Sequence, residues 1–253
     1  MVMLCVLDYY FIYSIIFLNK TRRKECAILM ISFTIENKTV NVFPSNEPDK
    51  PVVYLNTFNH EGEKVFQQLQ ASNCPDFTMV EICNLEWNHD MAPWSIPPIF
   101  ENSTPCSGGA NDYIKLLLEK IIPQAEKKIS GKLAWRGIAG YSLAGLFAIY
   151  TIYQTDVFSH IASMSGSLWF PGIKEYIFSN AVKRKPNHLY FSLGDRECKT
   201  RNKFLKCVQQ NTEEIVQFYK DQVIDTIFQM NPGNHYKNSV ERSAAGIMWL
   251  LNK

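Results

Sequence analysis

Short apolar runs alternate with amphipathic stretches along most of this chain. Six apolar runs bounded by turn residues predict buried strands, at residues 51–58, 77–83, 134–140, 160–166, 188–194 and 223–230. Alternating apolar residues over 31–44 predict a β-hairpin. Helical periodicity predicts helices at residues 63–71, 111–129, 143–153, 173–182, 199–219 and 240–251. Pro123 is expected to break or kink the second of these helices.

This alternation of strands and helices predicts an α/β fold with a mostly parallel central sheet. The strands lack polar alternation, which is typical of strands buried on both faces, so helices are expected on both sides of the sheet. No Pro/Gly/Ser-rich linker divides the chain, and we therefore expect a single domain over residues 30–253. Active sites in such sheets lie at the carboxyl ends of the strands.

The first 29 residues do not fit this pattern. Residues 1–18 are apolar apart from Asp8, and a basic stretch follows at residues 19–24. A membrane-spanning helix needs about 20 apolar residues, and an acidic residue near its centre costs about 2.5–3.5 kcal/mol. We therefore predict an extension outside the fold, with Met30 as the native start, and no stable membrane insertion. A membrane tether through residues 1–18 is the alternative.

Composition narrows the class of protein further. The 253 residues, 46% of them hydrophobic, can build one large α/β domain. A net charge of +2, with both signs scattered along the chain, argues against a nucleic-acid-binding protein. Seven cysteines without a CxxC pair argue against a disulfide framework or a zinc site. Reduced thiols favour a cytoplasmic protein.

The stretch GIAGYSLAGLFAIY, residues 137–150, places a serine between a predicted strand and a predicted buried helix. So tight a turn needs small neighbours, and Gly140, Ala144 and Gly145 meet this need. The side chain of Ser142 would then stand at the end of the sheet, where the N–H of Leu143 points toward a developing oxyanion. Ser142 is therefore a candidate nucleophile. The alternative is a helix N-cap serine.

In this architecture the nucleophilic serine is followed along the chain by an acid and then by a histidine. Asp195 directly follows the strand 188–194, and His235 lies in the loop before the last helix. His235 would accept the hydroxyl proton, while Asp195 would orient the imidazole and stabilise its charged form. Glu197 is a rival acid. A loop-capping role is the alternative for Asp195, and a surface-loop role is the alternative for His235.

The loop after the strand 51–58 should supply a second oxyanion donor. The backbone N–H of Thr57 or of Phe58 is the best placed there, although the sequence carries no His-Gly-Gly motif. His60 and Glu61, a little further along this loop, could instead line the substrate pocket. These four residues complete the predicted contacts on this side of the site.

A long loop at residues 85–112 follows the strand 77–83. Loops of this length at the active edge of a sheet are usually functional. Its polar and aromatic side chains, Asp90 and Trp94 among them, suit a pocket that binds a substrate through hydrogen bonds and apolar contact. The alternative is a packed surface loop anchored by tryptophan.

The motifs resemble the esterase family of α/β-hydrolases that includes esterase D and the enterochelin (siderophore) esterases. The likeness runs from about residue 31 to the end. It is carried by the serine motif and by SGSLW, SLGDRE, GNH, WNHDMAPW and GGANDYIKLLLEKIIP. The resemblance implies an α/β-hydrolase fold, ester or thioester hydrolysis without a metal or organic cofactor, and triad roles for Ser142, Asp195 and His235. Ala144 is a departure, because many members have glycine there.

We therefore predict a serine esterase acting on a small-molecule ester or thioester. Ser142 would form an acyl-enzyme, which water activated by His235 would hydrolyse. An acyltransferase with the same residues is one alternative, and a non-catalytic hydrolase-fold binding protein is another. The candidate loops hold no basic cluster, so nothing in them points to a polyanionic siderophore.

Overall fold

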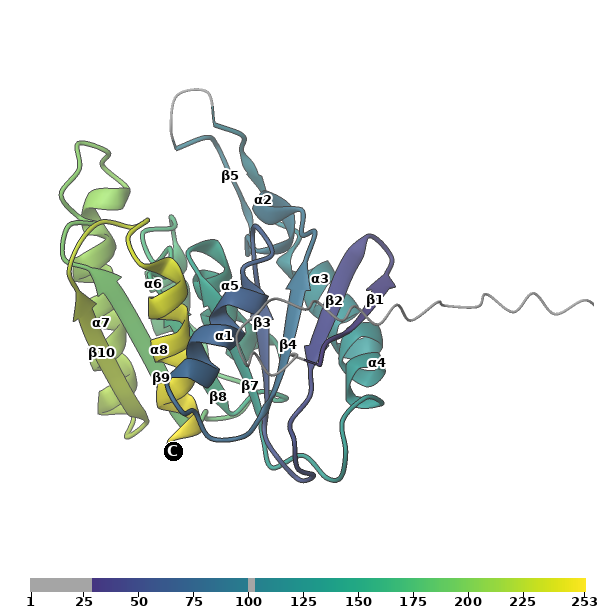
Figure 1. Cartoon of the computed structure of the whole chain (residues 1–253). Coiled ribbons are helices and arrows are strands. Elements are labelled where there is room, and N and C mark those ends of the chain that lie inside the picture. Colours follow the sequence, from purple (N-terminus) through teal and green to yellow (C-terminus); the bar gives the residue numbers. More distant parts are fainter. Residues whose placement is uncertain (1–28, 100–102) are drawn as a thin grey trace, which may run out of the picture.

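The computed structural model describes residues 29–99 and 103–253, which are built around an eight-stranded sheet (Figure 1). The strand order is β1-β2-β4-β3-β7-β8-β9-β10. These strands are β1 (Ile31–Ile35), β2 (Lys38–Phe43), β3 (Val52–Asn56), β4 (Thr78–Cys83), β7 (Arg136–Tyr141), β8 (His160–Met164), β9 (His188–Gly194) and β10 (Asp225–Asn231). β1, β2 and β4 pair antiparallel, and every pairing from β4 to β10 is parallel. The predicted mostly parallel sheet is confirmed.

Helices cover both faces of the sheet (Figure 1). On one face, α1 (Gly62–Ala71) and α8 (Ser239–Leu251) lie side by side. On the other face, α5 (Leu143–Gln154) packs on β7 and β8. The remaining helices are α2 (Trp87–Asp90), α3 (Ala110–Leu116), α4 (Ile122–Glu126), α6 (Ile173–Ser179) and α7 (Val208–Asp221). A short ribbon of β5 (Ser95–Ile96) and β6 (Cys106–Ser107) projects from the loop between β4 and α3.

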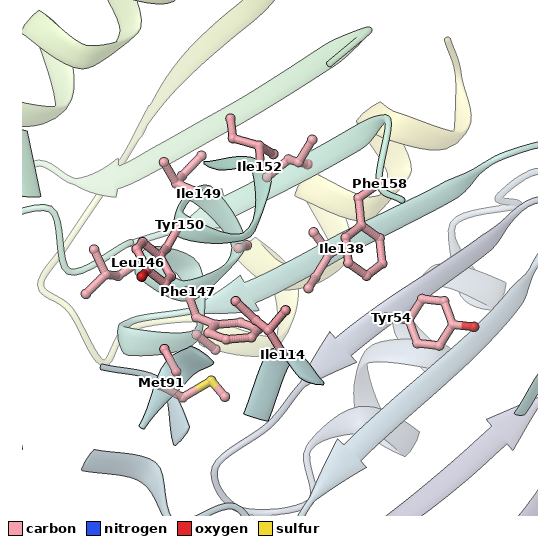
Figure 2. Packing of buried hydrophobic residues seen from close by; sticks show 14 of the residues in the cluster. Tyr54, Met91, Ile114, Ile138, Leu146, Phe147, Ile149, Tyr150, Ile152 and Phe158 are labelled. Carbon is pink, nitrogen blue, oxygen red and sulfur yellow. The ribbon is translucent and has the colours of Figure 1, made fainter. Parts of the chain in front are cut away.

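Two separate hydrophobic cores hold these layers together, because successive residues of a strand point to opposite faces. On β7, Ile138 belongs to the core beneath α5, together with Phe147 and Phe158 (Figure 2). The next residue, Ala139, belongs to the core beneath α1 and α8, together with Ile247. The helix α5 is buried along almost its whole length, as its uniformly apolar sequence predicts. This burial fixes the start of α5 at the end of β7.

Three predicted helices differ from the observed ones, and the smallest difference is at 173–182, where α6 ends three residues early at Ser179. The stretch 111–129 is divided into α3, a π-helical turn at Leu117–Ile121 and α4, and Pro123 stands in the first turn of α4. The missing proline N–H is tolerated at that position, so the interruption falls just before it. The stretch 199–219 is a loop and a short 3₁₀ turn, Leu205–Cys207, before α7 begins.

The predicted N-terminal extension lies outside the described residues, apart from Leu29. In the part of the chain that the structure describes, no helix has the length and apolar character needed to cross a bilayer.

Candidate active site

Ser142 occupies a strained turn between β7 and α5. Its backbone has φ = 60° and ψ = −123°, a conformation that costs a non-glycine residue energy and that is held by the packing around it. A Cβ on Gly140 would lie 2.3 Å from the carbonyl oxygen of Ala144, so only glycine fits two positions before the serine. The small residues around Ser142 are thus needed to avoid steric clashes in the tight turn, as the sequence predicted. Ser142 stands at the carboxyl end of β7.

Three side chains form a hydrogen-bonded chain at this edge of the sheet. The Ser142 Oγ lies 3.0 Å from Nε2 of His235, and Nδ1 of the same imidazole lies 2.7 Å from Oε2 of Glu197. The Glu197 side chain is 5% exposed and that of His235 is 28% exposed. A hydroxyl, an imidazole and a buried carboxylate therefore meet in the order that nucleophilic catalysis requires.

The prediction that Asp195 contacts His235 is wrong. Asp195 Oδ1 instead accepts a 2.7 Å hydrogen bond from the N–H of Gly233, at an exposed position. The reason is the turn that follows β9, in which the N–H of Glu197 donates to the carbonyl of Gly194 at 3.1 Å. This turn directs Glu197 toward the imidazole and leaves Asp195 on the outer side. The loop-capping alternative describes Asp195, and the rival acid takes its place.

The second oxygen of Glu197 is also well supplied with donors. Oε1 accepts hydrogen bonds from the Ser165 hydroxyl at 2.7 Å, the Gly194 N–H at 2.6 Å and the Arg242 guanidinium at 3.3 Å. Burial by itself would raise the pKa of Glu197, but the hydrogen bonds from His235, Gly194 and Ser165 and the charge on His235 hold that pKa below its ordinary value. Glu197 is therefore ionised and fixed in orientation.

Arg242 is a buried cation that the sequence gave no reason to single out. It lies on α8, is 3% exposed, and donates to the Tyr141 hydroxyl at 3.1 Å and to the Pro232 carbonyl at 3.2 Å. The Tyr141 hydroxyl in turn donates to the backbone carbonyl of His235 at 2.6 Å. Arg242 and Tyr141 thereby tie the histidine loop to β7 and α8. An amphipathic helix pattern does not reveal which charged residue turns inward.

The predicted oxyanion donors separate into two groups. The N–H of Thr57 donates to the Ile82 carbonyl at 3.0 Å, so the prediction of Thr57 as an oxyanion donor is wrong. The N–H groups of Phe58 and Leu143 make no such bond within the described part of the chain. Leu143 is the first residue of α5, where backbone N–H groups lack an intrahelical partner. Phe58 and Leu143 therefore remain the candidates.

A cavity of about 410 Å³ opens beside Ser142 and His235, a volume that suits a small-molecule ligand. Its walls come from the β3–α1 loop, α2, the end of β7 and the segment that leads into α8. Apolar and aromatic side chains form much of the lining, namely Leu55, Phe58, Val65, Trp87, Tyr141, Tyr236 and Val240. Trp87 lies in the long loop that we expected to be functional, whereas Tyr236 was missed although it directly follows the catalytic histidine candidate.

Three of the predicted substrate-binding residues lie elsewhere, as far as the described residues define the cavity. His60 is exposed, Asp90 forms a buried 2.5 Å ion pair with Lys38, and Trp94 donates to the Pro171 carbonyl at 3.0 Å. The prediction that these three residues line the substrate pocket is wrong. Asp90 and Trp94 have the packing role that was the alternative for their loop, because the β4–α3 connection uses them to attach itself to the body of the protein.

No group of three or more histidine, cysteine, aspartate or glutamate residues is arranged to hold a metal ion, among the residues that the structure describes. The cysteines within these residues that the structure places are free thiols, at positions 74, 83, 106, 198 and 207.

Comparison with known proteins gives the class. The model of the family described as "Putative esterase" matches residues 36–237, and the chain therefore belongs to this family. Membership in this family makes the chain a carboxylic ester hydrolase. Its similarity to solved structures of hydrolases shows that it has the α/β-hydrolase fold.

Individual relatives share little sequence identity with this chain. The chain is 22% identical over 231 residues to the uncharacterized protein YbbA of Bacillus subtilis, and the aligned region covers 85% of this chain and 92% of YbbA. The fold of this chain is similar to that of the siderophore hydrolase EstA from Aspergillus nidulans, with a TM-score of 0.71, 16% identity, and coverage of 88% of this chain and 94% of EstA. The enterobactin and salmochelin hydrolase IroE gives a TM-score of 0.67, 18% identity, and coverage of 88% and 94%.

Proposed function

We propose that this chain hydrolyses a carboxylic ester or thioester of a small molecule through an acyl-enzyme on Ser142. The observation that carries the proposal is the hydrogen-bonded chain of Ser142, His235 and Glu197, with its two distances of 3.0 and 2.7 Å. A non-catalytic binding protein of this fold would have no need to hold a nucleophile, a base and an ionised acid in line. The hydrogen-bonded arrangement of these three side chains therefore favours catalysis over the binding alternative.

In the first half of the reaction, Ser142 Oγ attacks the ester carbonyl while Nε2 of His235 removes the hydroxyl proton. The carbonyl oxygen becomes an oxyanion, which the N–H groups of Phe58 and Leu143 would stabilise. Glu197 stabilises the imidazolium that has formed. The imidazolium then donates its proton to the departing alcohol or thiol, and the acyl group stays on Ser142.

The second half repeats these steps with water as the nucleophile. Nε2 of His235 removes a proton from water as its oxygen attacks the acyl carbonyl, and the same two N–H groups receive the new oxyanion. Collapse of this intermediate breaks the bond to Ser142 Oγ, which takes the proton back from the imidazolium. A carboxylic acid leaves, and the three side chains regain their original protonation.

The substrate class is kept at the level of an ester or thioester. EstA and IroE are named as hydrolases of siderophores, of enterobactin and of salmochelin. The cavity beside Ser142, however, contains no lysine or arginine among its described lining residues, and such cations are the usual partners of a polyanionic ligand. For this reason the proposal does not extend to those substrates.

A fluorophosphonate probe tests the proposal directly. We expect covalent labelling of the wild-type protein, with the label on the peptide that contains Ser142, and no labelling of Ser142→Ala. Ser167→Ala is the matched control, because the Ser167 hydroxyl lies only 3.5 Å from that of Ser142, whereas the described hydrogen bonds of the His235 imidazole go to Ser142 and Glu197. Hydrolysis of p-nitrophenyl butyrate should follow the same pattern. Equal rates for the wild type and Ser142→Ala would refute the proposal.

A further inference from the structure

Charge is distributed unevenly around the cavity beside Ser142. Among its described lining residues, Glu61 is the only acidic side chain, and no lysine or arginine is present. The Glu61 carboxylate is held in place, since Oε2 accepts a 2.9 Å hydrogen bond from the N–H of Asn59. No described basic residue forms an ion pair with it. Glu61 therefore contributes a negatively charged residue to the cavity lining and has no ion-pair partner among the described residues.

Aromatic rings stand around the same space and are poorly covered by the rest of the protein. The rings of Phe58 and Trp87 meet edge to face, with their centroids 5.1 Å apart. Phe58 is 59% exposed and Tyr236 is 85% exposed, although both line the cavity. The faces of aromatic rings carry partial negative charge and attract cations, and tryptophan does so most strongly.

The basic side chains near the histidine loop lie in a different pocket. Arg196 and Lys237 border a separate pocket of about 200 Å³, together with Asp195 and the start of the histidine loop. Tyr236, on the same loop, lines the catalytic cavity instead. The histidine loop thus directs the Lys237 side chain to one pocket and the Tyr236 ring to the other. A substrate bound beside Ser142 meets aromatic surface and one carboxylate.

We propose that this cavity selects esters that carry an apolar, positively charged substituent, such as a quaternary ammonium group, and discriminates against anionic esters. The proposal rests on the esterase function proposed above and adds the substrate's charge class. A cation in this space would gain attraction from both the carboxylate of Glu61 and the aromatic rings, whereas an anion would be repelled by the carboxylate and would find no cation. From the usual size of cation–π attraction, the preference should be about 3- to 30-fold in kcat/KM.

Three thioesters of similar shape and different charge provide the test. They are acetylthiocholine, the neutral 3,3-dimethylbutyl thioacetate and the anionic 2-(acetylthio)ethanesulfonate, all assayed by release of the thiol. The expected order of kcat/KM in the wild type is cationic, then neutral, then anionic. This comparison uses the full-length wild-type protein. It therefore tests the proposal even if a variant fails to fold.

Glu61→Gln then tests the residue that the proposal names. Glutamine keeps an acceptor oxygen for the N–H of Asn59, so the loop should hold its shape while the charge is lost. We expect the cationic-to-neutral ratio of kcat/KM to fall by about three- to tenfold and the anionic-to-neutral ratio to rise. Glu63→Gln is the matched control, since it removes the same charge from the first turn of α1 outside the cavity lining. It should leave both ratios unchanged.

The outcomes separate this proposal from the esterase function. Labelling of Ser142 and hydrolysis of the neutral thioester would support the esterase function. If the three thioesters are then hydrolysed at equal rates, or if Glu61→Gln and Glu63→Gln shift the ratios equally, the proposed charge selectivity is wrong while the esterase function stands. If the anionic thioester is the best substrate, the selectivity is reversed and the proposal fails. If Ser142 is not labelled and no thioester is hydrolysed, the proposed function fails and the selectivity fails with it.

Discussion

The carboxylate of Glu197 lies 2.7 Å from Nδ1 of His235, although 38 positions of sequence separate the two residues. Asp195, which directly follows the strand, holds the N–H of Gly233 from the outer side of the same loop. One carboxylate therefore orients the imidazole while the other supports the loop that carries it. Since both side chains reach the same loop, they form a matched pair for testing which acid supports catalysis.

Glu197→Gln should lower kcat for p-nitrophenyl butyrate by about 10²- to 10⁴-fold. A neutral amide cannot stabilise the imidazolium, and it can present an N–H to Nδ1 and so favour the wrong tautomer of His235. Because Arg242 also contacts this carboxylate, thermal unfolding should be measured alongside the kinetics to show that the variant is folded.

Asp195→Asn is the control for that experiment. An amide oxygen at position 195 can still accept the hydrogen bond from Gly233, so kcat should stay within about threefold of the wild type, as for most exposed substitutions. The assignment of the acid would be contradicted by the reverse pattern, in which Asp195→Asn inactivates the enzyme and Glu197→Gln does not.

Gly140→Ala should destabilise the protein, because the new Cβ would lie 2.3 Å from the carbonyl oxygen of Ala144 and 2.6 Å from its Cβ. Overpacking of this kind costs about 1–3 kcal/mol, and the turn that holds Ser142 would shift with it. Urea unfolding measures the first effect, and kcat measures the second. Gly137→Ala, on the same strand, is the comparison. Its nearest neighbours would lie at 3.1 and 3.2 Å, so a similar loss in both variants would argue against a special constraint at the serine turn.

Much of this fold was predictable because its strands are short apolar runs between turn residues. Such runs predict a strand from the local sequence alone, without knowledge of the elements that pack against it. The hairpin of β1 and β2 and four of the six other strands lie within the predicted stretches, whereas β7 and β10 each end one residue later. The prediction that β10 is buried is wrong, because this strand lies at the edge of the sheet and is mostly exposed. The short β5–β6 ribbon was not predicted, since two-residue strands carry no periodicity. The π-helical turn before Pro123 depends on how the helix packs, and the sequence indicates only that an interruption is needed.

The residues of the candidate site likewise divide into those that the local sequence predicts and those that depend on tertiary contacts. Ser142 was predictable because the constraint on it is local, and His235 because the chain order of its partners is fixed by the architecture. The choice between Asp195 and Glu197 depended on one turn after β9, whose direction no residue pattern specifies. Tyr236 and the buried Arg242 become visible only when the last helix is placed against the sheet, since their roles arise from tertiary contacts.

Stability should fall on acidification partly because of His160, on β8. This residue is 3% exposed, its ring stacks on Trp135 with centroids 3.8 Å apart, and burial, followed by the charges on His188 and Arg184, lowers its pKa from 6.5 to about 4. Between pH 6.5 and 4 the unfolded chain therefore binds the proton and the folded protein does not. The stabilisation is complete above pH 6.5 and is lost as pH falls toward 4, by about 3 kcal/mol in total.

Urea unfolding of the wild type and His160→Gln at pH 7.5 and pH 5 checks this prediction. Glutamine does not titrate, so the variant should lose about 2 kcal/mol less than the wild type between these two pH values, whatever its stability at pH 7.5. An identical loss in the two proteins would show that His160 does not contribute to the pH dependence.

Glu81 on β4 should act as a positioning residue for the loop that carries the Phe58 N–H. The side chain is 1% exposed, and its oxygens accept hydrogen bonds from the Thr57 hydroxyl at 2.8 Å, the Gly62 N–H at 2.7 Å and the Asn41 amide at 2.9 Å. All three partners donate to the carboxylate, although the Thr57 hydroxyl and the Asn41 amide could also accept. Glu81→Gln removes the buried charge that strengthens these three hydrogen bonds, and so weakens the hold on the loop.

We expect Glu81→Gln to lower the free energy of unfolding by about 1–3 kcal/mol. Since the loop between Thr57 and Gly62 carries the Phe58 N–H that we propose as an oxyanion donor, kcat should also fall by about ten- to a hundredfold while KM changes little. Thr57→Val removes one hydrogen bond without introducing a donor, so its effects on kcat and stability should be smaller. A destabilised Glu81→Gln protein with unchanged kcat would mean that the position of the Phe58 N–H does not depend on this carboxylate, or that this N–H does not contact the oxyanion.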